Sequence, residues 1–86
     1  MDIEILKLKA YVEISKYRVR IIKALSDDVK MPSQLARECD ISVHHISNYL
    51  RNLKEHDLIE CINEEVRKGR LYRLTENGIK VEKMMK

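Results

Sequence analysis

A run of hydrogen-bonding side chains between residues 42 and 51 is the first feature of the sequence that suggests chemistry. Its members, with one apolar residue among them, are Ser42, Val43, His44, His45, Ser47, Asn48 and Arg51. An asparagine such as Asn48 can bind adenine through two hydrogen bonds, an imidazole such as His44 can donate to guanine, and Val43 can pack on a thymine methyl. The set therefore favours the reading of base edges in a DNA groove.

Some residues of this run also suit phosphate. Ser42 would lie at a helix N-terminus, where unpaired N–H groups and partial positive charge attract an anion. Arg51 is better placed for the DNA backbone, and Ser47 can reach either a base or a phosphate. For Ser47 and Asn48 an ordinary solvated helix face is the alternative.

Three stretches, 14–26, 41–54 and 66–75, contain basic residues and no acidic residue. The last of them holds Arg67, Lys68, Arg70 and Arg73. If these stretches shared one face, that face would attract a polyanion. In a chain with 17 Lys and Arg among 86 residues, chance clustering is the alternative. Ser33 and Gln34 could also donate to a phosphate, or could belong to solvated surface.

Neither a catalytic site nor a metal site is expected. The sequence has no glycine-rich phosphate loop and no recognisable Ser-His-Asp set, and so small a core could not enclose a carboxylate pair. His44 and His56 would lie about 18 Å apart along one helix, too far to share an ion. Cys39 and Cys61 lack the short spacing of a zinc knuckle and are expected to be reduced and buried. We therefore expect no enzyme, no cofactor and no metal.

The length and composition indicate one small folded domain, residues 1–86. Apolar residues make up 44% of the chain and charged residues 36%, and the net charge is +3. A core of this size is marginal unless something such as a dimer supplements it. No apolar run approaches the roughly 18 residues that cross a bilayer, and the first residues are acidic where a signal peptide is basic. We therefore expect a cytoplasmic protein without a membrane partner.

The first segment, residues 2–27, is predicted to be one long helix or two. Its beginning is apolar on two sides. One side carries Ile3, Leu6, Ala10 and Ile14, and the other carries Ile5, Leu8 and Val12. A helix with two apolar faces often packs against a partner chain, so we expect a homodimer formed by this helix together with the last one.

The remaining elements follow from caps and periodicity. Pro32 starts a short helix, and Ser42 caps a third helix that runs to about His56 with its apolar stripe inward. Strands are expected at 58–62 and 70–74, joined by a polar stretch in a hairpin. Thr75 caps a last helix over 75–86. The second and third helices, within 32–56, are separated by the spacing of a helix-turn-helix unit, with Ala36 inward, Asp40 in a left-handed conformation and Ile41 entering the next helix.

With these elements in place, the sequence resembles the winged helix-turn-helix regulators of the ArsR and MarR type over about residues 15–80. The segments that carry the resemblance are Leu35-Ala36, Ile41-Ser42, Ile46-Ser47, Leu50, Leu53, Leu58-Ile59 and the run from Lys68 to Gly78. The resemblance implies a mainly α fold with a small β-hairpin, in the order helix, helix, helix, strand, strand, helix. It also implies a prokaryotic regulator, which we expect to be archaeal.

The resemblance implies double-stranded DNA as the partner. The hairpin, residues 58–74, would be a wing whose tip places Arg67, Lys68 and Arg70 along phosphates or in the minor groove. Glu64 and Glu65 argue against contact along its whole length and are expected on the far strand. The paired cysteines of ArsR-type metal sensors are missing, so metal sensing is not carried over, and no small-molecule ligand is evident.

The sequence thus predicts a homodimeric, sequence-specific DNA-binding transcriptional regulator. Two alternatives stay open. The winged helix could serve as a protein interaction module, since a fold does not fix its partner. It could also bind DNA without regard to sequence, as chromatin-like architectural proteins do.

Overall fold

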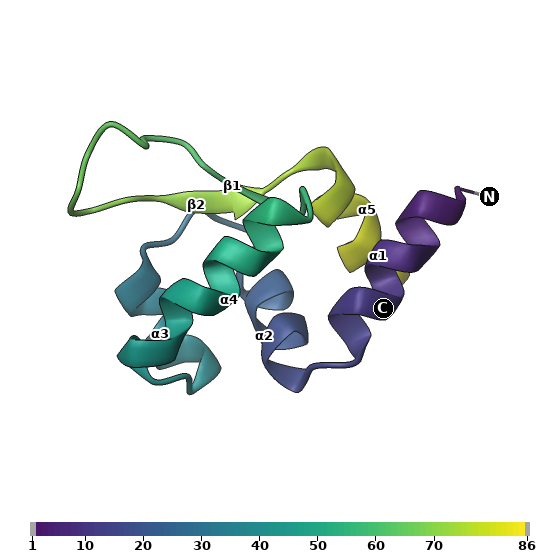
Figure 1. Cartoon of the computed structure of the whole chain (residues 1–86), viewed down its shortest axis with the longest axis horizontal. Helices are drawn as coiled ribbons and strands as arrows, with labels where there is room; N and C mark the ends of the chain where they lie inside the picture. Colours follow the sequence, from purple (N-terminus) through teal and green to yellow (C-terminus); the bar gives the residue numbers. More distant parts are fainter. Residues whose placement is uncertain (1, 86) are drawn as a thin grey trace.

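The computed structural model describes residues 2–85, which form five helices and one two-stranded antiparallel sheet (Figure 1). The helices are α1 (Ile3–Glu13), α2 (Lys16–Ala24), α3 (Pro32–Cys39), α4 (Val43–Glu55) and α5 (Glu76–Met84), and the strands are β1 (Ile59–Cys61) and β2 (Tyr72–Leu74). The order confirms the winged helix-turn-helix fold. The molecule is elongated, 39 × 25 × 21 Å, with the hairpin loop at one end of the long axis and α1 at the other.

The first 27 residues form two helices rather than one. Ile14 closes α1, and the Ser15 hydroxyl accepts a hydrogen bond from the Arg18 amide as the N-cap of α2. Ser15 itself is extended, with φ −129° and ψ 118°, so the helical hydrogen-bond ladder is broken there. The periodicity left open whether residues 2–27 form one helix or two, and the Ser15 cap shows that they form two.

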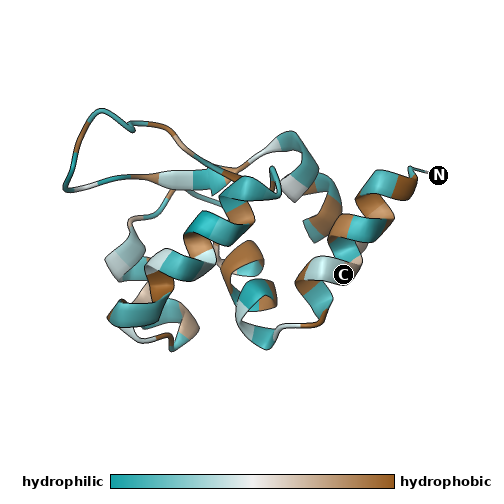
Figure 2. Cartoon of the chain, viewed as in Figure 1, coloured by the Kyte–Doolittle hydropathy of each residue, from teal (hydrophilic) through white to brown (hydrophobic). Residues whose placement is uncertain are grey.

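The core takes only one of the two apolar faces of α1. Ile5 and Val12 are buried among residues of α2 to α5, whereas Ile3 is 66% exposed and Ile14 80% exposed. Leu6 and Ala10, on the same side as these two, are also exposed. In Figure 2, apolar and polar residues alternate along α1, which lies at the end of the molecule farthest from the wing. A stripe formed by Ile3, Leu6, Ala10 and Ile14, called here the α1 stripe, is thus left open to solvent.

The turn between α3 and α4 has the geometry that its residues predict. Asp40 is left-handed, with φ 56° and ψ 48°, and the Ile41 amide donates to the Ala36 carbonyl at 2.9 Å. Cys39 and Ile41 are buried on either side of Asp40. The turn therefore fixes the angle at which α4 leaves α3.

Asp40 supplies a test of this turn. A β-branched residue in the left-handed region costs about 1–2 kcal/mol, whereas glycine adopts it without a Cβ clash. We therefore expect Asp40→Val to lower the free energy of unfolding by about 1–2 kcal/mol relative to Asp40→Gly, as measured by urea denaturation. Equal stabilities of the two variants would contradict the backbone geometry described.

The hairpin is shorter than expected. The sequence predicts strands at 58–62 and 70–74, but each strand has three residues, with Ile59 opposite Leu74 and Cys61 opposite Tyr72. Beyond Ile62, which still bonds to Leu71, the Asn63 side chain replaces the ladder: its Oδ1 accepts from the Leu71 amide at 2.8 Å and its Nδ2 donates to the Gly69 carbonyl at 3.1 Å. This side chain therefore shapes the start of the wing loop.

The loop end of strand β2 is joined to the segment before α3. Lys30 and Tyr72 exchange two backbone hydrogen bonds, of 3.0 and 2.9 Å, as an isolated antiparallel bridge. Lys30 lies two residues before Pro32, which opens α3. The hairpin and the helix-turn-helix unit are thus connected by main-chain bonds.

The last helix begins as predicted, with the Thr75 hydroxyl accepting from the Gly78 amide at 3.1 Å. Gly78 is buried against Leu58, the residue before β1, and a Cβ built on it would lie 2.1 Å from the Leu58 carbonyl oxygen. The helix ends at Met84 with Met85 as its cap, which is short of the expected end at 86. Residue 86, like residue 1, lies outside the described residues.

Candidate nucleic-acid interface

Helix α4 presents one face to the core and the opposite face to solvent. Ile46, Leu50 and Leu53 are buried and Tyr49 is half-buried, as the apolar stripe predicts. At the N-terminus of α4, the Ser42 hydroxyl accepts from the His44 amide at 3.1 Å. This cap leaves other amides of the first turn directed toward an approaching anion.

Every side chain that was expected to read DNA from this helix is exposed. They are Ser42, Val43, His44, His45, Ser47, Asn48 and Arg51. Val43 is 65% exposed, which is unusual for a large apolar side chain and suits a residue that packs on a base. Arg51 donates to Asn48 Oδ1 at 3.1 Å, and this oxygen keeps a second lone pair while the amide NH₂ keeps its donors. Asn48 can therefore still form a bidentate contact.

The wing places two of its three expected basic residues at its tip. Arg67 and Lys68 are exposed beside Gly69, whose φ of +75° makes the turn. Arg70 is different, because its guanidinium donates to the Val66 carbonyl at 2.7 Å and to the Glu64 carbonyl at 3.3 Å. Arg70 thus holds the loop in shape, in addition to any contact it makes with DNA.

The acidic residues of the wing are not where they were expected. Glu64 and Glu65 lie in a turn after β1 instead of on a strand, because Asn63 ends the ladder before them. Glu64 forms an ion pair with Lys54 of α4, and Glu60 on β1 pairs with Arg73 at 2.7 Å. The negative charges of Glu60 and Glu64 are therefore balanced by neighbouring basic side chains.

A hollow of about 290 Å³ separates α4 from the wing. It is lined by Pro32, Ser47, Leu50, Arg51, Lys54, Arg70 and Tyr72. Three of these side chains are basic, so the hollow attracts anions. At the start of α3, Ser33 is exposed, whereas Gln34 is half-buried and its Oε1 accepts from the Met31 amide at 3.0 Å, which leaves only its NH₂ for a phosphate. The hollow itself lies along one side of α4.

A stack of side chains that sequence reasoning missed joins α1 and α2 to the end of α4. The rings of Tyr11 and His56 are parallel within 16°, with centroids 3.8 Å apart, and the Arg18 guanidinium lies 3.8 Å from the Tyr11 centroid. Arg18 also donates to the Tyr11 carbonyl at 2.7 Å. Pairings between distant segments of this kind have no local signal in the chain.

Among residues 2–85, no group of three or more potential metal ligands gathers at one place. Cys39 is buried, as expected, and burial raises the pKa of its thiol, which keeps it protonated and unreactive. Cys61 is half-buried rather than buried. No helix in the described part of the chain is long and apolar enough to span a membrane.

The hairpin beside a helix-turn-helix unit, with an exposed polar face on the second helix of that unit, defines a winged helix-turn-helix domain. The chain belongs to the helix-turn-helix domain family, whose model matches residues 14–62 and so includes α2, α3, α4 and β1. No curated protein matches the sequence significantly.

Two solved structures of a mutant of Lactococcus lactis ZitR are similar to this chain. The first has a TM-score of 0.72 at 22% identity and covers 83% of this chain and 49% of the ZitR chain. The second, in the apo form, has a TM-score of 0.74 at 20% identity and covers 93% of this chain and 61% of that one. The likeness at these identities concerns the fold, and the chain spans about half to three fifths of the length of the ZitR chains.

Proposed function

We propose that this chain is a sequence-specific regulator of transcription, of the ArsR and MarR type, that binds double-stranded DNA as a homodimer. The observation that carries the proposal is the exposed face of α4. Residues suited to base edges and phosphates project from it, with no acidic side chain among them, from Val43 to Arg51. Residues 1–86 act in this proposal as one DNA-binding domain.

Charge and geometry support a duplex as the partner. The wing tip with Arg67 and Lys68 and the basic hollow beside α4 flank the face that would enter a major groove. A duplex presents a base-bearing groove between two rows of phosphates, which matches this order of side chains. The proposal places the protein in the cytoplasm of a prokaryote, and its archaeal origin stays a prediction.

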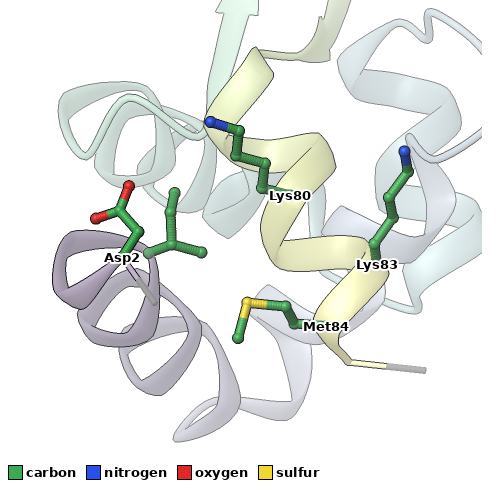
Figure 3. A pocket seen from close by; sticks show the side chains of 5 residues that line it. Asp2, Lys80, Lys83 and Met84 are labelled. Carbon is green, nitrogen blue, oxygen red and sulfur yellow. The ribbon is translucent and has the colours of Figure 1, made fainter.

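The homodimer is supported by the α1 stripe. A separate groove of about 360 Å³ lies between α1 and α5 and is lined by Asp2, Ile5, Lys80, Lys83 and Met84, with Met84 pointing toward α1 (Figure 3). The stripe lies at the opposite end of the long axis from the wing (Figure 1), so two-fold pairing there would keep both wings outermost. Two α4 helices could then enter successive major grooves about 34–36 Å apart.

Asn48→Ala tests the reading of bases. We expect it to reduce binding to the preferred site by about 1–3 kcal/mol while leaving binding to random duplex nearly unchanged, because the lost contact is to a base. The preferred site is first selected from a random-sequence library by the wild-type protein. Fluorescence anisotropy gives the affinities for both duplexes, and their ratio, compared between the variant and the wild-type protein, is the test.

Lys68→Gln is the matched control for that experiment. It removes a phosphate contact, so it should weaken the binding of both duplexes alike and reduce the slope of log K against log salt by about one. A wild-type protein that binds random and selected duplexes equally would indicate a chromatin-like role, and one that binds neither at low salt would leave a protein interaction module. Either result rejects the proposed function.

A further inference from the structure

A second basic surface lies on α2 and was not among the residues expected to bind DNA. It consists of Lys16, Tyr17 and Arg20 and is called here the α2 edge. Lys16 Nζ lies 5.2 Å and Arg20 Cζ 5.4 Å from the centroid of the Tyr17 ring, while both basic residues are exposed. The aromatic ring thus holds two cations at one place on the surface.

The α2 edge adjoins α4 on the side away from the wing. The Tyr17 ring packs against that of Tyr49, with centroids 5.7 Å apart. Tyr49 in turn lines a hollow of about 370 Å³ together with His45, Asn48 and Asn52. The residues of α4 that face the wing hollow are a different set, Ser47, Arg51 and Lys54. The exposed face of α4 is therefore flanked by basic residues on both sides.

The charges at the α2 edge are available to an anion. Lys16 lies in the acid-free stretch 14–26, and the acids on either side of that stretch are Glu13, which is paired with Lys9, and Asp27, beyond the end of α2. Arg20 donates one hydrogen bond, to the Cys39 carbonyl at 3.1 Å, and has further N–H groups to offer. Exposed Asp40 follows Cys39 and offsets part of the Arg20 charge. Of the two residues, Lys16 therefore has the positive charge that is less offset by a neighbouring acid.

On the basis of the proposed function, we propose that the α2 edge binds backbone phosphates of the same duplex, on the opposite side of the major groove from the wing. A recognition helix in a major groove has a row of phosphates on each side. The wing approaches one row, and the α2 edge, next to His45 and Tyr49, approaches the other. These contacts add affinity without adding sequence preference.

The test compares salt dependence in single and double variants. Lys16→Gln should weaken binding to random duplex and to the selected site by the same factor, about threefold to tenfold, and lower the salt slope by about one. Combined with Lys68→Gln, it should lower the slope by about two, because the contacts lie on separate rows of phosphates. Arg73→Gln, which removes the same charge from β2, where Arg73 is paired with Glu60, is the control and should leave the slope unchanged.

Arg20 is tested by two replacements because its bond to Cys39 also steadies the α3–α4 turn. Arg20→Gln should lower the slope by about one, and Arg20→Lys, which keeps the charge, should restore it. If Lys16→Gln and Arg73→Gln behave alike while Lys68→Gln lowers the slope, the α2 edge does not touch DNA and the proposed function stands. If the wild-type protein fails to bind duplex at all, the proposed function itself fails.

Discussion

Under the proposed homodimer, replacing both Ile3 and Ile14 with glutamate should give a monomer and weaken binding to a palindromic site by a factor of about 10² to 10⁴. These residues belong to the α1 stripe and are 66% and 80% exposed, so the folded monomer loses little when they change. In a dimer, four glutamates would face one another across an apolar seam, which is strongly unfavourable. Losing the second recognition helix removes the effective concentration that two linked half-sites provide.

Sedimentation equilibrium and anisotropy measure the two effects of this double substitution. Ile79→Glu is the matched control, since Ile79 is 44% exposed on α5 but lines a different hollow, with Leu25 and Leu74. It should leave the dimer intact. A wild-type protein that sediments as a monomer at micromolar concentration, or a double variant that still dimerises, would show that the α1 stripe has another use.

The second large effect is expected from Gly78→Ala, a change of one methyl group. The new Cβ would lie 2.1 Å from the Leu58 carbonyl oxygen, which already accepts a hydrogen bond from the Thr75 amide at 3.0 Å. The Leu58 oxygen belongs to the main chain, so relief requires α5 to move away from the segment before β1. Overpacking and the weakened bond together should lower the free energy of unfolding by about 3–4 kcal/mol.

For a domain of this size, the loss of stability should lower the melting temperature by more than about 10 °C. Gly69→Ala provides the comparison, because a Cβ at Gly69 meets nothing within 4 Å and its cost is limited to the φ of +75°. That cost is about 1–2 kcal/mol. Should Gly78→Ala melt within a few degrees of the wild-type protein, the packing of α5 on Leu58 is looser than described.

The sequence predicted those parts of the fold that are specified by neighbouring residues. Pro32, Ser42 and Thr75 begin helices because each satisfies or dispenses with an amide of the first turn, and Asp40 adopts the left-handed conformation that the turn requires. The exposed face of α4 followed from the buried stripe, since a helix that buries Ile46, Leu50 and Leu53 must turn Asn48 outward. These are local or periodic signals.

Features that depend on pairing between distant segments were not predictable. Both faces of α1 are apolar, so periodicity could not say that Ile5 and Val12 would enter the core. A second left-handed residue, Asp57 with φ 56°, ends α4, and its carbonyl accepts from the Thr75 hydroxyl at 2.6 Å, a contact that needs α5 in place. The role of Arg70 in bracing the wing likewise depends on carbonyls that only the folded loop presents.

The bridge between Lys30 and Tyr72 has a consequence for how a duplex would be read. Two main-chain bonds at the loop end of β2 tie the hairpin to the segment before α3, so under the proposed function the hairpin and α4 would meet DNA as one rigid body. The duplex must then adjust its own groove width to satisfy both at once. Because the ease of that adjustment depends on base composition, under the proposed function we expect discrimination at base pairs beneath the hairpin that no side chain touches.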